Sequence, residues 1–162
     1  MNNIYKFVAL LSFLLISAPL RAEVNVSSDD IKAIKQAALN YIESQHQVKP
    51  ENMKKALHKK LAKRTFWRST QGEDYVMETS YETMIKVAAS YNEKGDKFPK
   101  EPKKTVKILD ADERVASIKL TADDWIDYMH LIKDGDGQWK IINVLWRYHD
   151  ISKHVSTYIV KD

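Results

Sequence analysis

Asp127 and His130 are ionisable residues of a segment, Asp124 to Lys133, whose composition predicts a β-strand. Side chains alternate between the two faces of a strand, so Asp127 shares a face with Trp125, Met129 and Leu131. A carboxyl group among large apolar neighbours has a raised pKa, which makes Asp127 a candidate for proton abstraction. The more common role of such a carboxylate is structural: it accepts backbone hydrogen bonds or pairs with an arginine such as Arg64 or Arg147.

His130 falls on the opposite face, with Ile126, Tyr128 and Ile132. It is a candidate ligand-binding or acid–base group. The more common environments for a histidine on an apolar strand face are a dimer interface or a hydrogen bond inside the core. We therefore keep His130 as a secondary candidate.

His58 lies in a second predicted helix, which Pro50 begins. The inward residues of that helix are predicted to be Met53, Ala56, Leu57 and Leu61. A helix that continued through His58 would point its ring toward solvent. A helix that ended near Leu57 would let the ring turn toward a cavity mouth.

Aromatic side chains supply further candidates for a pocket wall. Tyr41 and Tyr81 lie on the apolar stripes of the first and third predicted helices, and each buried hydroxyl needs a partner. Flat walls for a planar ring could come from Phe66, Trp67, Trp125 and Trp146. The alternative for any one of them is that it fills the protein interior.

Other kinds of site have less support in the sequence. A basic cluster comprises Lys54, Lys55, Lys59, Lys60, Lys63 and Arg64, and a solvated helix face is its ordinary explanation. The histidines at 46, 58, 130, 149 and 154 match no zinc signature, so we expect no metal site and no cofactor. There is no cysteine nucleophile, glycine-rich phosphate loop or nucleic-acid motif.

The elements that must position these residues follow the order helix, helix, hairpin, helix and four-stranded meander. The first helix opens at Ser27 to Asp30 and should end near His46, and Thr79 with Glu82 should cap the third. A short hairpin is predicted from 64–69 and 75–78. The meander strands are predicted at 104–110, 113–121, 124–133 and 138–148. This order indicates an α+β fold with helices on one side of a curved antiparallel sheet.

The last of these strands is apolar at both parities, which is unusual for a sheet with one face in water. Trp139, Ile141 and Leu145 would share one face, and Ile142, Val144 and Trp146 the other. We therefore expect helices to cover one face and another sheet or a second subunit to cover the other. Asp134 to Gly137 would form the turn that leads into this strand.

Composition suggests a compartment and a domain count. Residues 1–22 have the layout of a secretory signal peptide, with Lys6 before an apolar run from Phe7 to Ile16. Residues 23–162 then suit a single domain, periplasmic or secreted, with no cysteine. The 26 basic and 22 acidic residues become 24 and 22 once Lys6 and Arg21 are removed. This near-neutral balance gives no case for nucleic acid, or for a membrane after signal cleavage.

Three segments carry a family resemblance: ALHKKLAKR from Ala56, DWIDYMHLIK from Asp124 and GQWKIINVLW from Gly137. They resemble the putative lumazine-binding family of the nuclear transport factor 2-like superfamily, which includes polyketide cyclases and ketosteroid isomerases. The resemblance implies a cone-shaped domain around an apolar cavity, with a sheet face that often forms a homodimer. Members commonly carry His-Pro where this chain has His58 followed by Lys59.

These observations support a first hypothesis: an exported, dimeric, non-catalytic binder of a small apolar or aromatic molecule. An enzyme of the isomerase, dehydratase or cyclase type is the second, with Asp127 or His58 as base and Tyr41 or Tyr81 steadying an oxyanion. A dimeric interaction module without ligand is the third. The shared fold does not decide among them.

Overall fold

The computed structural model describes residues 26–156 of the chain. The predicted signal peptide and the domain boundary after residue 22 lie outside this range. Three helices are present: α1 (Ser28–His46), α2 (Pro50–Ala56) and α3 (Tyr81–Ser90). The strands are β1 (Leu57–Ser69), β2 (Asp74–Thr79), β3 (Lys104–Asp112), β4 (Val115–Ala122), β5 (Trp125–Lys133), β6 (Trp139–Tyr148) and β7 (Val155–Ser156). A short 3₁₀ helix, η1 (Ile151–Lys153), precedes β7. The predicted order of elements and the α+β class are confirmed.

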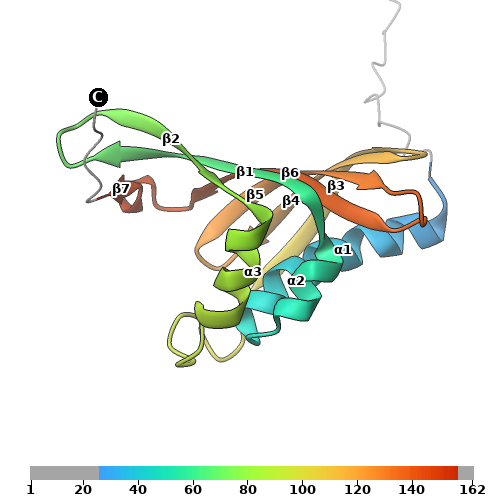
Figure 1. The fold of residues 1–162 in the computed structure, drawn as a ribbon, viewed down its shortest axis with the longest axis horizontal. Coiled ribbons are helices and arrows are strands. Elements are labelled where there is room, and N and C mark those ends of the chain that lie inside the picture. Colours follow the sequence, from blue (N-terminus) through green and yellow to red (C-terminus); the bar gives the residue numbers. More distant parts are fainter. Residues whose placement is uncertain (1–25, 157–162) are drawn as a thin grey trace, which may run out of the picture.

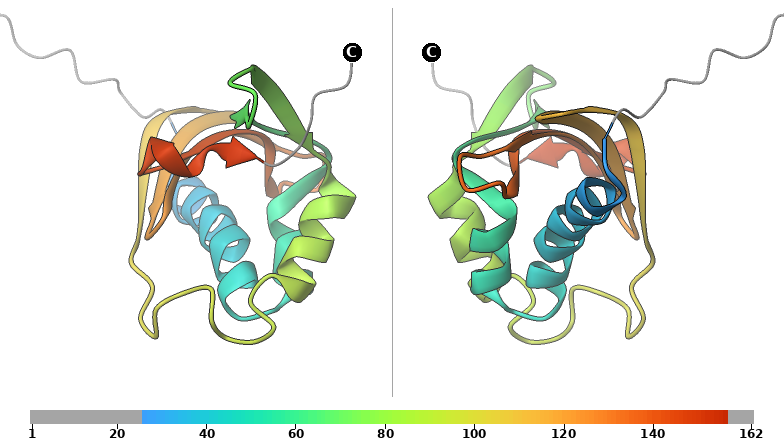
Figure 2. Two further views of the ribbon diagram at one scale, coloured as in Figure 1. Left: turned by 90° about the vertical axis from the view of Figure 1, so that its left-hand side faces the viewer. Right: turned by 90° about the vertical axis from the view of Figure 1, so that its right-hand side faces the viewer.

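The described strands form a seven-stranded sheet in the order β2-β1-β6-β5-β4-β3, with β7 beside β1. Neighbouring strands are antiparallel except that β1 runs parallel to both β6 and β7. The sheet curves over the three helices, which all lie against its concave face (Figures 1 and 2). The core fills the space between the sheet and α1, and includes Ile34, Ile42, Ile118, Met129 and Ile141.

The helix starts follow from local capping. The Ser27 hydroxyl accepts a hydrogen bond from the Asp30 amide at the start of α1, as expected. The third helix begins one residue later than the sequence predicted, because the Ser80 hydroxyl accepts from the Thr83 amide and makes Ser80 the cap. The predicted capping role of Thr79 is therefore wrong.

The second helix is shorter than predicted, and the prediction that it continues to Leu61 is wrong. Leu57 has extended backbone angles, φ −99° and ψ 143°, and begins β1. Leu57 and Leu61 are four residues apart, a spacing that places two side chains on one face of a helix or of a strand. Parallel pairing with β6 decides in favour of the strand, and His58 lies in β1 rather than in a helix.

The last meander strand, β6, contains a β-bulge that the sequence analysis did not anticipate. Pairing with β5 shifts register between His130 and Leu131, where Asn143 and Ile141 are the partners and Ile142 is the extra residue. Odd-numbered residues face the core before the bulge, and even-numbered residues face it after the bulge. Trp139, Ile141 and Val144 are all buried, whereas Leu145 is 58% exposed. The predicted grouping of Trp139, Ile141 and Leu145 on one face is therefore wrong.

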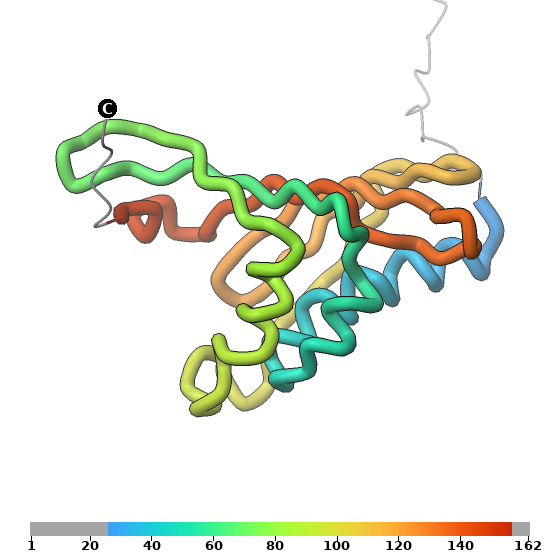
Figure 3. The backbone as a smooth tube through the Cα atoms, viewed as in Figure 1, coloured from blue at the N-terminus to red at the C-terminus, as the bar shows by residue number. Residues whose placement is uncertain are grey.

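The hairpin of β1 and β2 projects beyond the helices, and β7 lies alongside its far end (Figure 3). At its base, β2 leads directly into α3, so the hairpin and this helix form one side of the molecule (Figure 1). None of the helices in residues 26–156 combines the length and apolar character needed to cross a membrane.

Candidate functional site

A pocket of about 190 Å³ lies between the base of the projecting hairpin and the helices. Its walls are mostly apolar and include Met77, Met84, Val87, Trp125 and Trp146. Its polar lining includes Tyr41, Gln45 and Lys63. An apolar enclosure with a few convergent polar groups is the usual form of a small-molecule site.

Six separate elements place these side chains: α1, β1, β2, α3, β5 and β6. Alternation along β2 turns Met77 toward the pocket, while the α3 stripe contributes Met84 and Val87. Trp146 reaches the pocket because the bulge in β6 returns the strand's later residues to the concave face. The pocket therefore depends on the long-range packing of the hairpin and α3 against the meander and α1.

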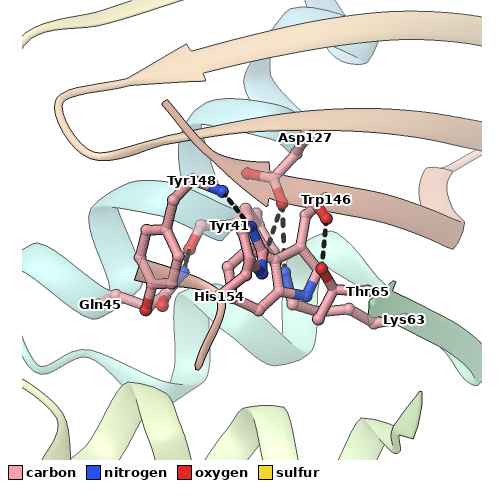
Figure 4. Close-up of polar contacts among 8 residues, drawn as sticks. All are labelled: Tyr41, Gln45, Lys63, Thr65, Asp127, Trp146, Tyr148 and His154. Carbon is pink, nitrogen blue, oxygen red and sulfur yellow. Dashed lines mark hydrogen bonds and ion pairs between the residues drawn. The ribbon is translucent and has the colours of Figure 1, made fainter. Parts of the chain in front are cut away.

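The polar end of the pocket is backed by a buried network of three residues (Figure 4). The Lys63 Nζ donates to the Tyr41 hydroxyl oxygen at 2.7 Å and lies 3.1 Å from Asp127 Oδ1. The Tyr41 hydroxyl donates a longer bond, 3.5 Å, to the same carboxylate oxygen. Lys63 Nζ also lies 4.7 Å from the ring centroid of Trp146, within range of a cation–π interaction.

Burial shifts the pKa values of Asp127, Lys63 and Tyr41. It raises the pKa of Asp127, and the nearby Lys63 ammonium opposes this rise. It lowers the pKa of Lys63, with Asp127 acting in the opposite direction. The pKa of Tyr41 is raised by burial and by the Asp127 charge, which keeps the phenol protonated. The shifts of the acid and the amine converge, so a neutral pair lies closer in free energy to the ion pair than it would in water.

The predicted pairing of Asp127 with arginine is wrong, because its partner is Lys63. Arg64 pairs with Glu78 at 2.8 Å on the surface, and Arg147 donates to the carbonyl oxygen of Tyr148. The expectation that Lys63 belongs to a solvated basic face is also wrong, since this residue is only 7% exposed. Asp127 itself is fully buried and does not line the pocket.

Comparison with protein-family models assigns the chain to a family. The model described as putative lumazine-binding matches residues 29–147. The chain belongs to this family. A search of curated proteins found no match.

Solved structures agree with this family on the fold. An NTF2-like protein of unknown function from Silicibacter pomeroyi DSS-3 superimposes with a TM-score of 0.61 at 13% identity, over 76% of this chain and 99% of that one. An NTF2-like protein of unknown function from Methylobacillus flagellatus KT gives 0.59 at 22% identity, over 80% and 99%. A ketosteroid isomerase-like protein from Erwinia carotovora atroseptica gives 0.51 at 10% identity, over 76% and 99%. These likenesses establish an NTF2-like fold.

Within this lumazine-binding-family domain, the predicted site residues fall into several groups. Tyr41, Trp125 and Trp146 line the pocket. Asp127 does not, but it is paired with Lys63, which does. His58 and Tyr81 line a different hollow, whose other residues are mainly lysines. His130 lies exposed on β5, where its Nδ1 is 3.1 Å from the Asn143 side-chain nitrogen.

Phe66 and Trp67 lie further along β1 and contact the ring of His154, which was not among the predicted pocket residues. His154 is 1% exposed, and its ring stacks on Phe66 at a centroid distance of 4.5 Å. Its Nε2 accepts a hydrogen bond from the Tyr148 amide at 2.7 Å. That bond requires an unprotonated Nε2, and burial lowers the pKa of His154 accordingly.

Two signals in the sequence could have led to Lys63, but none pointed to His154. Lys63 shares a strand face with Leu61 and Thr65 once the short α2 is recognised, and a buried carboxylate requires a cation nearby. His154 offered no comparable pattern, because its burial depends on β7 pairing with β1. The described residues contain no group of three or more side chains suited to hold a metal ion.

Proposed function

We propose that this protein binds a small, flat, mainly apolar molecule without transforming it, and that the ligand carries a hydrogen-bond acceptor. The observation that carries this proposal is the junction of apolar walls with one buried ammonium group. Aromatic and methionine side chains surround the ring of the ligand, and the Lys63 Nζ meets its acceptor atom.

The size of the pocket limits the ligand. A dry cavity of about 150 Å³ holds benzene in an engineered protein. The present pocket, at about 190 Å³, therefore suits one ring with a polar substituent or a compact bicycle. The Trp146 and Trp125 side chains favour a flat ligand because stacked or edge-on rings gain energy beyond that of buried area.

Binding is better supported than acid–base catalysis by the candidate groups. Asp127 is held by Lys63 and Tyr41 and does not reach the pocket surface, so it is not a free base. His58 lies in a separate hollow, and its Nδ1 accepts from the Lys60 amide. A general base must lie within hydrogen-bond reach of the proton that it removes.

Thermal-shift and tryptophan-fluorescence titrations test the proposal. One- and two-ring carbonyl compounds, including pteridine-diones, should raise the melting temperature and quench tryptophan emission. Met77→Trp should abolish both effects because the larger side chain fills the pocket. Val76→Trp is the matched control, because Val76 is 69% exposed and precedes Met77 in the same strand.

An absence of stabilisation across such a series would contradict the proposal. Equal binding to the Met77→Trp and Val76→Trp variants would place the ligand elsewhere on the protein.

A further inference from the structure

We propose that Lys63 captures a small aldehyde or ketone in this pocket as a reversible imine. The inference rests on the proposed function, since the pocket must first admit the molecule. It assigns a chemical class to the ligand and a covalent role to a residue that would otherwise only position it.

The geometry around Lys63 is suited to this chemistry. Its side chain is 9% exposed, and it lines a pocket whose walls are largely apolar. The ion-paired lysines 32, 54, 97, 104, 133 and 153 have side chains that are 29–78% exposed. Among the described residues, Lys63 is the one buried lysine.

The neighbours of the amine include a proton acceptor and a proton donor. Asp127 Oδ1 lies 3.1 Å from Nζ, and the Tyr41 hydroxyl lies 2.7 Å from it. Asp127 Oδ2 is buried and has no hydrogen-bond partner among the described residues, so the carboxyl group has capacity for a proton. Burial also lowers the pKa of Lys63 and raises that of Asp127, which favours transfer of a proton from the amine to the carboxylate.

The reaction balances without an oxidant or a reductant. The Lys63 ammonium gives one proton to Asp127, and the free amine attacks the carbonyl carbon. The carbonyl oxygen takes a proton through Tyr41, whose phenol is replenished from the network, and a carbinolamine forms. Asp127 then returns its proton to the carbinolamine hydroxyl, which leaves as water while the nitrogen lone pair forms the C=N bond, and a protonated imine remains beside the Asp127 carboxylate. The net change is amine plus carbonyl to imine plus water, and hydrolysis reverses it.

Reductive trapping on the full-length protein tests the inference. Benzaldehyde with sodium cyanoborohydride at neutral pH converts each imine into a stable benzylamine, which mass spectrometry of peptides assigns to individual lysines. Burial lowers the pKa of Lys63 and so raises the fraction of its amine that is neutral and nucleophilic. We expect Lys63 to be labelled faster than Lys32, whose side chain is 78% exposed.

Three variants locate the chemistry. Lys63→Arg keeps a cation beside Asp127 but removes the nucleophile, so labelling at this position should disappear. Asp127→Asn removes the carboxylate charge that opposes the lowering of the Lys63 pKa, so a larger fraction of the amine is neutral and Lys63 should be labelled faster, while the labelling of Lys32 is unchanged. Lys104→Arg is the matched control at another ion pair, 2.8 Å from Glu43, and should label at Lys63 as the wild type does.

Competition with benzyl alcohol, which fits the pocket but forms no imine, separates the two proposals and needs no folded variant. If benzyl alcohol slows the labelling of Lys63 but not that of Lys32, the result supports both the binding proposal and the imine proposal. Stabilisation by benzyl alcohol with Lys63 labelled no faster than Lys32 overturns the imine and leaves the binding proposal standing. No stabilisation by benzyl alcohol or by the carbonyl series, together with unselective labelling, overturns both.

Discussion

The buried pair of Lys63 and Asp127 is the residue-scale feature on which the pocket depends. Both charges are removed from water, and the desolvation penalty is offset only while each has its partner. One member without the other leaves an uncompensated charge in an apolar interior. Each member of the pair is therefore needed for stability while the other is present.

Asp127→Ala should lower the free energy of unfolding by about 3–5 kcal/mol, because the Lys63 ammonium remains buried without its partner. The double variant Lys63→Met/Asp127→Leu should recover much of that loss, since it removes both charges at similar volume. Urea denaturation of the two proteins measures the difference.

A surface pair provides the control for this experiment. Arg68 and Asp74 are each 59% exposed, and Asp74→Ala should leave the free energy of unfolding nearly unchanged because solvent screens an exposed ion pair. Additive losses for Lys63→Met and Asp127→Leu in the double variant would mean that the two residues are not energetically coupled.

The sequence predicted the burial of Asp127 but not its partner, for a physical reason. Strand parity is local and identifies the face of β5 correctly. The partner, Lys63, lies on β1. This strand pairs in parallel with β6, and β6 separates it from β5. Residue spacing does not specify such a long-range order of strands, and Arg64 is directed to the opposite face from Lys63 because the two are adjacent in one strand.

At the scale of elements, the first turn of α1 is tied to the β5–β6 hairpin through Asp30. Its carboxylate accepts hydrogen bonds from Lys133 Nζ at 2.7 Å and from the Trp139 indole at 2.8 Å. Together with the Ser27 hydroxyl, these donors lower the pKa of Asp30 to about 2. Trp139 is 4% exposed, so this contact joins the helix to a buried part of the sheet.

The Asp30 contact should make stability depend on pH in the acid range. Its folded pKa of about 2 is below the usual 3.8, so the carboxylate stabilises the fold above pH 4 and loses this effect as pH falls through 2. Asp30→Asn should lower the urea midpoint at neutral pH and show a smaller loss than the wild type across that acid window. Asp29→Asn, at a side chain 88% exposed in the same turn, should match the wild type at each pH.

A second element-scale contact holds β7 against the hairpin. His154→Ala removes the acceptor of the Tyr148 amide, and an unpaired buried donor costs about 1–3 kcal/mol. Hydrogen exchange should then quicken at the amides of Tyr148 and Arg68, the latter of which donates to the His154 carbonyl. His149→Ala, at the exposed residue next to Tyr148, should leave both amides protected. Unchanged protection in His154→Ala would show that the His154 ring does not hold β7 against the hairpin.

Periodicity predicted the order and approximate limits of the elements but not their irregularities. The end of α2 at Ala56 and the bulge at Ile142 both arise from pairing between β1, β5 and β6. Residues four apart lie on one face of a helix and also of a strand, so this spacing does not distinguish the two. A bulge requires no particular residue type, so the sequence does not show where it occurs. Tertiary pairing therefore decided both positions.

At the scale of the whole molecule, the bulge leaves limited apolar surface on the convex face of the sheet. Tyr128 and Leu145 are cross-strand partners there and are 46% and 58% exposed. Lys119 and Arg64 continue the same row on the neighbouring strands. This exposed apolar pair is the surface through which we propose that a homodimer forms.

Light scattering coupled to gel filtration tests the dimer. We expect a dimeric wild-type protein and a monomeric Leu145→Lys variant whose melting temperature is unchanged, because Leu145 contributes little to the core. Val76→Lys, at an exposed residue of β2, is the control and should remain dimeric. A monomeric wild-type protein would remove the convex face as an interface.

The bulge at Ile142 also gives β6 one residue more than its pairing with β5 requires. Deletion of this one residue would restore simple alternation and leave Val144 and Trp146 on the concave face and Leu145 on the convex face, because the residues on either side keep their partners in β5. Deletion of Val144 would instead leave the bulge in place and bring Leu145 to the core face. Loss of Ile142 should therefore leave the fold intact and loss of Val144 should prevent folding, and thermal unfolding of the two deletion variants measures the difference.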